Sequence, residues 1–166
     1  MNKDLIDKYI KEGSQEYRRL DATILKYFIF DDKENLKLPS YRVPVDPKFV
    51  KRVTHVDKDT VPGAKFYNEV MWILPGFGAD QTNDNPNFKE EHTHDFGELM
   101  CFYGYNYDDI MDLGAEIEFW IDGEKHMINE SFTAFIPAGI KHGPLTIKNV
   151  KRPIAHLIAC DTGSYK

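Results

Sequence analysis

The sequence predicts an all-β domain in which short strands fold into a sandwich or a barrel. From residue 66 onward, short apolar segments alternate with turn residues, and helical periodicity is almost absent. Asp122-Gly123, between two such segments, is the pattern of a two-residue hairpin. The first 65 residues follow different patterns. We therefore expect an N-terminal extension, residues 1–65, followed by a β-barrel, residues 66–166.

The extension is predicted to contain a short helix and an extra strand. In residues 4–11, apolar side chains recur at helical spacing. Residues 22–30 are rich in aromatic and β-branched side chains and read as a buried strand. Prolines exclude helix through most of residues 36–65 and favour extended or edge segments there. We expect the extension to pack on the barrel or at a dimer interface.

Six strands are expected in the barrel, and each is bounded by turn residues. The clearest pattern is in residues 116–121, where Ile117, Phe119 and Ile121 alternate with Glu116, Glu118 and Trp120. Successive side chains of a strand point to opposite faces, so one face of this strand is predicted to be buried. The expected strands are residues 68–74, 98–102, 116–121, 125–128, 133–136 and 154–160.

Composition excludes several classes of function. The 166 residues carry a net charge of −6, with no Lys/Arg cluster longer than two, which argues against nucleic-acid binding. No apolar run is long enough to span a bilayer. The two cysteines lack paired spacing, so neither a disulfide framework nor a cysteine zinc site is indicated. We expect a cytoplasmic domain whose partner is a small molecule.

The segment Glu90–Glu98 holds the chemically informative residues. His92 and His94 are two apart, so their imidazoles lie on the same face only if the segment is extended. Glu98 opens the next expected strand and could point back toward them. Neutral imidazoles with one carboxylate suit a divalent transition metal such as iron, manganese, nickel or zinc, and calcium is disfavoured.

Two motifs in this sequence resemble those of the cupin superfamily. Cupin motif 1 reads G-x5-H-x-H-x3-4-E-x6-G, and this sequence supplies the two histidines, the glutamate and a closing glycine one residue early. Motif 2 reads G-x5-P-x-G-x2-H-x3-N, and the proline, glycine and histidine are present. The first glycine of each motif and the last asparagine of motif 2 are replaced. The matching residues are His92, His94, Glu98 and Gly104 for motif 1, and Pro137, Gly139 and His142 for motif 2.

The resemblance covers roughly residues 66–160 and implies a single double-stranded β-helix, the small jelly roll. It also implies one divalent transition metal (Fe, Mn, Ni or Zn) held by His92, His94, Glu98 and His142. Both enzymes and binding proteins occur in the superfamily. The implied function is an enzyme of the dioxygenase, isomerase, decarboxylase or lyase class acting on a small oxygen-bearing metabolite. The alternative is a non-catalytic metal- and ligand-binding cupin, a sensor or an accessory protein.

Three residues are candidates for catalysis beside the metal. Tyr103 and Tyr105, in the connection between the two motifs, could supply a hydroxyl as general acid or base. The alternative is an aromatic anchor in a solvated acidic loop. His156 shares a strand face with apolar residues and could enter the barrel as a proton shuttle, or it is a hydrogen-bonded core histidine. A homodimer is expected by analogy with related cupins.

Overall fold

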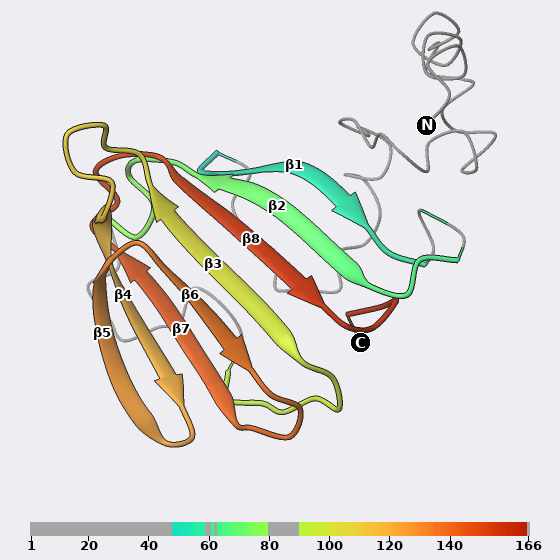
Figure 1. The fold of residues 1–166 in the computed structure, drawn as a ribbon. Coiled ribbons are helices and arrows are strands. Elements are labelled where there is room, and N and C mark those ends of the chain that lie inside the picture. Colours follow the sequence, from blue (N-terminus) through green and yellow to red (C-terminus); the bar gives the residue numbers. More distant parts are fainter. Residues whose placement is uncertain (1–47, 59–60, 62, 80–89, 166) are drawn as a thin grey trace, which may run out of the picture.

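The chain folds into two antiparallel sheets that face one another (Figure 1). The computed structural model describes residues 48–58, 61, 63–79 and 90–165. These residues contain no helix, so none of them forms a segment that could cross a membrane as a helix. The strands are β1 (Val50–Val56), β2 (Tyr67–Ile73), β3 (Glu98–Gly104), β4 (Asp112–Ile121), β5 (Glu124–Glu130), β6 (Phe132–Ile136), β7 (His142–Lys148) and β8 (Ile154–Cys160).

The strand order identifies the fold as a jelly roll. One sheet has the order β1-β2-β8-β3-β6 and the other the order β5-β4-β7. From β3 onward the chain passes repeatedly between the sheets, so that β8 pairs with both β2 and β3. This double-sheet arrangement with non-sequential neighbours is the double-stranded β-helix. The predicted fold class is confirmed.

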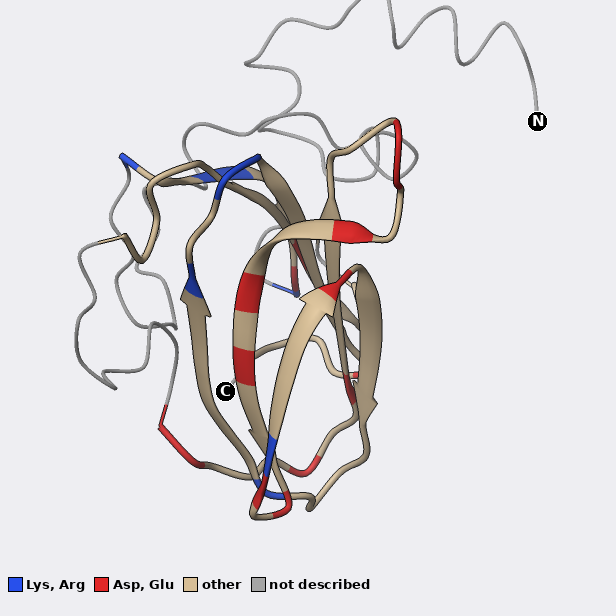
Figure 2. Cartoon of the chain, turned by 90° about the vertical axis from the view of Figure 1, so that its left-hand side faces the viewer, with Lys and Arg blue, Asp and Glu red and all other residues tan. Residues whose placement is uncertain are grey.

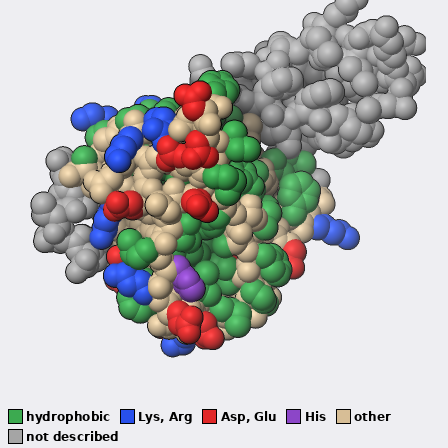
Figure 3. Space-filling model, turned by 60° about the vertical axis from the view of Figure 1, so that its left-hand side comes forward, with side chains coloured by type: hydrophobic (Ala, Val, Ile, Leu, Met, Phe, Trp, Pro, Cys, Tyr) green, Lys and Arg blue, Asp and Glu red, His purple; other side chains and the backbone are tan. Residues whose placement is uncertain are grey.

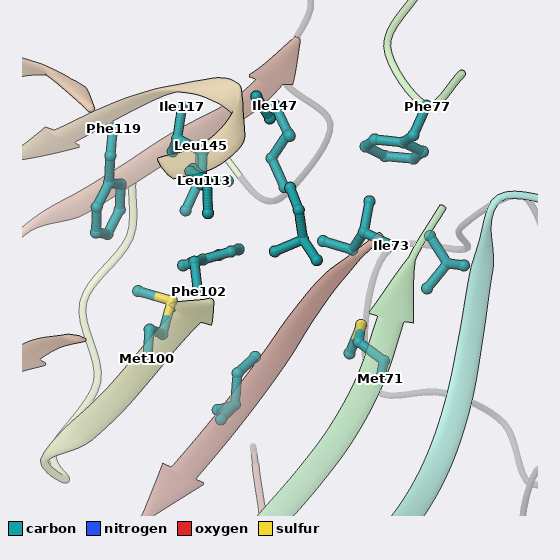
Figure 4. Packing of buried hydrophobic residues seen from close by; sticks show 14 of the residues in the cluster. Met71, Ile73, Phe77, Met100, Phe102, Leu113, Ile117, Phe119, Leu145 and Ile147 are labelled. Atoms are coloured by element: carbon teal, nitrogen blue, oxygen red, sulfur yellow. The ribbon is translucent and has the colours of Figure 1, made fainter. Parts of the chain in front are cut away.

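The core lies between the two sheets. Alternate residues of β2 and β8 are buried along their whole length, as a period of two requires when one face is covered. Phe102, Ile117 and Ile147 are fully buried. Figure 4 shows side chains of the five-stranded sheet directed toward those of the opposite sheet; the labelled residues are Met71, Ile73, Phe77, Met100, Phe102, Leu113, Ile117, Phe119, Leu145 and Ile147.

All six expected strands are present. The hairpin at Asp122-Gly123 is confirmed, because both residues have the positive φ angles, 50° and 78°, of a type I′ turn. Sequence reasoning missed β7, which contains Pro144. Proline cannot donate to the ladder, and here it lies at the shift of register between β4 and β7.

The predicted extension contributes an edge strand to the larger sheet. β1 lies within residues 1–65 and pairs with β2, which agrees with the expectation of extended or edge segments between the prolines. The predicted helix at residues 4–11 and the predicted strand at residues 22–30 lie outside the described residues. The boundary at residue 65 stays a prediction.

Charged residues lie on neighbouring strands of the three-stranded sheet (Figure 2), and some of them form ion pairs on its outer face. Glu118 on β4 accepts a hydrogen bond from Trp120 and lies 2.9 Å from Lys125 Nζ and 3.6 Å from Lys148 Nζ. The hydrogen bond from Lys125 is the largest cause that lowers the pKa of Glu118, and it outweighs the opposing effect of burial. A carboxyl group with a lowered pKa in the folded state stabilises the fold at neutral pH.

Glu118→Gln is expected to lower the free energy of unfolding at pH 7 by less than about 1 kcal/mol, because the pair lies at the surface. Since the pKa is lowered on folding, the contribution is present above the ordinary value of 4.5 and is lost as the pH falls through the lower folded value. Urea denaturation of both chains from pH 7 down to pH 4 measures it. Glu124→Gln, on the exposed hairpin, is the control. A difference that grows as the pH falls contradicts the assignment.

Candidate metal centre

Backbone pairing brings the two histidine-bearing segments together. His92 forms an isolated antiparallel bridge with His142, the first residue of β7. The amide of each donates to the carbonyl of the other, at 2.9 Å and 3.0 Å. The amide of Gly139 donates to the carbonyl of His94 at 2.8 Å. Gly139 has a φ of +81°, a conformation that glycine adopts without strain.

Glu98 reaches the same place as the first residue of β3. It shares the inner face of the sheet with Met100 and Phe102, which belong to the core, and its exposed fraction is 1%. The turn before it is held by Asp161: the Gly97 amide donates to Asp161 Oδ1 at 2.8 Å, and the Asp161 amide donates to the Gly97 carbonyl. The chain beyond β8 therefore fixes where β3 begins.

The three motif histidines converge. One possible ligand atom from each of His92, His94 and His142 lies within 4.8 Å of the others. The ring centroid of His142 is 4.3 Å from that of His92 and 4.7 Å from that of His94. These residues come from both motifs, so the segments that the sequence places about 50 positions apart form one cluster of nitrogen donors that could hold a metal ion.

Each imidazole is oriented by a backbone carbonyl. Nδ1 of His92 lies 2.7 Å from the carbonyl of Glu90, and Nδ1 of His94 lies 2.7 Å from that of Phe96. Nδ1 of His142 lies 2.9 Å from the carbonyl of Ile140. A carbonyl oxygen only accepts, so Nδ1 is the protonated nitrogen in all three rings. In the neutral form of each ring, the lone pair is therefore on Nε2.

Glu98 completes the group on its buried side. Its Oε2 lies 3.2 Å from Nε2 of His94 and 3.2 Å from Nε2 of His142. A carboxylate oxygen facing two nitrogen lone pairs is repelled unless a proton or a cation lies between them. Imidazole nitrogens with one carboxylate are a usual ligand set for divalent transition metals, and carbonyl groups commonly hold such histidines from behind. The residues present thus fit a metal.

The four residues of the cluster are buried to different degrees, and Nε2 of both His92 and His142 is buried. Glu98 and His142 are 1% and 2% exposed, whereas His92 and His94 are partly exposed. The ring of His94 stacks on Phe96, with centroids 4.0 Å apart. Buried Tyr165 lies 6.2 Å from His94, ring to ring, and was not expected from the sequence. It follows β8 outside any motif, so no local pattern marks it.

The structure does not bring Tyr103 and Tyr105 to the cluster. Side chains alternate along β3, so Tyr103 lies on the face opposite to Glu98, on the outside of the sheet. Its hydroxyl is 2.7 Å from Thr133 Oγ1, and it is 45% exposed. Tyr105 is 52% exposed, and its hydroxyl is 2.6 Å from that of Tyr107. These two tyrosines are outer-surface residues.

His156 faces the interior but lies away from the cluster. It pairs with Phe102 across β8 and β3, four residues along β3 from Glu98, which is about 13 Å of strand. Its Nδ1 is 2.9 Å from the Cys101 carbonyl, and its ring stacks on Phe102 at 4.0 Å. This placement agrees with the alternative of a hydrogen-bonded core histidine.

Solved structures of other proteins are similar to this fold, but the comparisons by sequence found no match. No protein-family model matches the sequence, and no curated protein matches it. The solved structures to which it is similar include an oxalate oxidase, at 14% identity and a TM-score of 0.43. That match covers 71% of this chain and 53% of the other, so this chain spans about half the length of that oxidase chain.

Two further solved structures are similar over most of both chains. An RmlC-like cupin from Shewanella frigidimarina NCIMB 400 is 9% identical, with 82% of this chain and 92% of that chain covered and a TM-score of 0.43. KdgF from Halomonas sp. is 13% identical, with 79% and 91% covered and a TM-score of 0.40. In the chain itself, the jelly-roll strand order and the meeting of His92, His94 and His142 from two motifs confirm the resemblance to the cupin superfamily.

Proposed function

We propose that this chain binds one divalent transition metal through His92, His94, Glu98 and His142 and acts there on a small oxygen-bearing metabolite. Iron, manganese, nickel and zinc are the metals that three imidazoles and a carboxylate suit. The proposed activity is enzymatic, of the dioxygenase, isomerase, decarboxylase or lyase class. The alternative, a metal- and ligand-binding protein without catalysis, is separated from it by the experiment below.

The observation that carries this proposal is the set of three Nδ1–carbonyl hydrogen bonds. Without them, each ring could turn either nitrogen toward the others. With them, the neutral rings of His92, His94 and His142 all present an Nε2 lone pair to one cluster. Such preorganisation stabilises a bound cation, because the ligands lose little freedom when it binds.

The roles of the chain's own groups follow from their positions. Buried Glu98 supplies negative charge on the core side, where few solvent molecules compete. His92 and His94 are partly exposed, so we propose that a small molecule approaches from their side. When bound, the metal supplies Lewis acidity at an oxygen of the substrate or, if it is iron, a position for dioxygen.

Metal stoichiometry tests the first part of the proposal. The full chain is stripped with a chelator, dialysed, and titrated with Mn²⁺, Fe²⁺ under anaerobic conditions, Ni²⁺ or Zn²⁺, followed by calorimetry and elemental analysis. We expect one equivalent per chain for at least one of these ions. A chain that binds none of them at micromolar concentration overturns the proposal.

The magnetic relaxation rate of water protons in a solution of the Mn²⁺-loaded chain distinguishes an enzyme site from a site that only binds the metal. An enzyme site keeps an open position for water or substrate. We therefore expect enhanced relaxation of bulk water, and a decrease when malonate, a bidentate oxygen ligand, is added. Relaxation no greater than that of a fully coordinated chelate, and unchanged by malonate, would favour the non-catalytic alternative.

A further inference from the structure

A cavity of about 190 Å³ lies at the end of the three-stranded sheet opposite to the metal centre. β4 and β7 are antiparallel, so Ile121 pairs with His142 at one end and Glu116 pairs with Lys148 at the other. The cavity is at this second end, where β4 begins and β7 ends (Figure 1). Its polar lining residues are Asp112, Glu116, Asn129, Asn149, Lys151 and Arg152.

An irregular stretch of β4 opens this cavity. Asp112 pairs with Glu130 and Ile117 pairs with Ile128, so five residue steps of β4 lie against only two steps of β5. Asn129 of β5 lies between these paired positions, opposite the extra residues of β4. Strands with extra residues redirect their side chains, and such irregularities are frequent next to functional sites.

The guanidinium of Arg152 is fixed beside the start of β4. Its Nη2 donates to Oδ2 of Asp112, which also accepts from Asn106 Nδ2 at 3.0 Å. The hydrogen bond from Asn106 is the largest cause that lowers the pKa of Asp112, so this carboxylate is ionised at neutral pH. Gly114 has a φ of +69°, and a Cβ there would lie only 2.8 Å from Nη2 of Arg152. The guanidinium thus occupies the place that a side chain of residue 114 would take.

The net charge is positive at one end of the cavity. There the negative charge of Asp112 offsets the positive charge of Arg152. Lys151, whose amide donates to the Gly114 carbonyl at 2.8 Å, adds one positive charge at the same end. Figure 3 shows basic and acidic side chains close together in the upper part of the described domain.

The other end of the cavity carries the negative charge of Glu116. This residue is two positions beyond Gly114 along β4, which is about 7 Å of strand. Its Oε2 accepts from Asn149 Nδ2 at 3.3 Å. Lys148, opposite Glu116 in the ladder, is directed toward Glu118, with its Nζ 3.6 Å from Glu118 Oε2. A cationic group in the cavity would therefore meet the Glu116 carboxylate.

We propose that this cavity binds a small zwitterion, with its carboxylate at the end of Lys151 and Arg152 and its ammonium group at the end of Glu116. Two acidic and two basic side chains line the cavity, so its net charge is zero. A ligand with no net charge and two separated opposite charges matches both ends, whereas a simple anion or a simple cation matches only one. The site is separate from the metal centre and does not depend on a bound metal.

The cavity is large enough for an aliphatic amino acid. A water molecule takes about 30 Å³ of the liquid, so the cavity has the volume of roughly six waters. 4-Aminobutyrate is of this size, and three methylene groups separate its two charged ends, which suits two ends of a cavity about 7 Å apart. The amides of Asn129 and Asn149 can donate to its carboxylate or accept from its ammonium group.

The test is the binding of 4-aminobutyrate to the full-length, metal-free chain at neutral pH, followed by ¹H–¹⁵N NMR. We expect saturable shifts of the side-chain amide signals of Asn129 and Asn149. Butyrate lacks the ammonium group and butylamine lacks the carboxylate. Each should bind at least roughly 10-fold more weakly than 4-aminobutyrate, because each loses its hydrogen bonds to charged groups at one end.

Glu116 and Lys151 are both exposed, so they can be replaced without disturbing the core. Glu116→Gln should weaken the binding of 4-aminobutyrate roughly 10-fold and leave that of butyrate unchanged. Lys151→Gln should weaken the binding of 4-aminobutyrate and of butyrate and leave that of butylamine unchanged. Glu124→Gln, at the opposite end of β5, is the matched control and should bind 4-aminobutyrate as the wild-type chain does.

Two results would overturn the proposal. One is the absence of shifts in these amide signals at about 10 mM 4-aminobutyrate, which would exclude even millimolar affinity. The other is equal affinity for the three probes, or unchanged affinity for 4-aminobutyrate in both Glu116→Gln and Lys151→Gln. The charges at the two ends would then have no part in binding.

Discussion

Replacing His142 by alanine is expected to weaken metal binding strongly while the barrel stays folded. The change removes one of three convergent nitrogens and also the ring that lies nearest to His92 in the cluster. Loss of a residue that hydrogen-bonds to a metal ligand, without binding the metal itself, typically weakens metal affinity 10–100-fold. Loss of a ligand should therefore weaken it by more than about 100-fold. Elemental analysis after dialysis and a competition titration with a chromophoric chelator measure the effect.

Two further variants make this prediction specific. Glu98→Gln keeps the shape of the side chain but removes its charge, and it too should lower metal affinity strongly. His126→Ala is the matched control, because it removes an exposed histidine from β5, outside the cluster. If folded His142→Ala and folded Glu98→Gln both kept their full metal content, the metal would be bound at a site other than this cluster.

Phe102→Ala is expected to cost about 3–5 kcal/mol of unfolding free energy, the largest loss of stability that we predict. Phe102 is fully buried, its ring lies 5.2 Å from that of Phe132, and it stacks on His156 at 4.0 Å. Truncation removes these contacts and leaves a cavity between the sheets, which packed neighbours fill only in part. A loss of this size is a large fraction of the stability of a small domain.

Urea denaturation of the metal-free chain at one fixed protein concentration measures this loss, since association would otherwise shift the apparent stability. Phe66→Ala is the control, because Phe66 is the same residue type but 52% exposed. It should cost far less than Phe102→Ala. Equal losses for the two variants would contradict the view that the core between the sheets holds the fold together.

The strands and the motif histidines could be predicted because their signals are local. Alternation along residues 116–121 reflects which side chains the sheet buries, and Ile117 and Phe119 are indeed buried. The spacing of His92 and His94 selects an extended segment, and their partial burial alternates with exposed neighbours as expected. β7 was missed because Pro144 weakens the strand pattern.

The same alternation decides where Tyr103 lies. Applied from Glu98 along β3, it predicts that Cys101 points away from the face that carries Glu98, and Tyr103 has the same parity as Cys101. The structure shows the consequence: Thr133 Oγ1 lies 3.5 Å from Cys101 Sγ and 2.7 Å from the Tyr103 hydroxyl, on the outer side. By this parity Tyr103 lies on the outer side of the sheet, away from Glu98.

The sequence by itself determined which side chains are available as ligands and where most of the strands lie, because residue identity and a period of two are properties of the chain alone. The tertiary structure alone decided that the carbonyls of Glu90, Phe96 and Ile140 hold the three rings in one tautomer. It also decided that an apolar sheet face lies toward the outside. The outward face depends on pairing between strands that are distant in sequence. Each carbonyl lies only two residues from its histidine, but the residue pattern does not specify the backbone path that directs the carbonyl toward the ring.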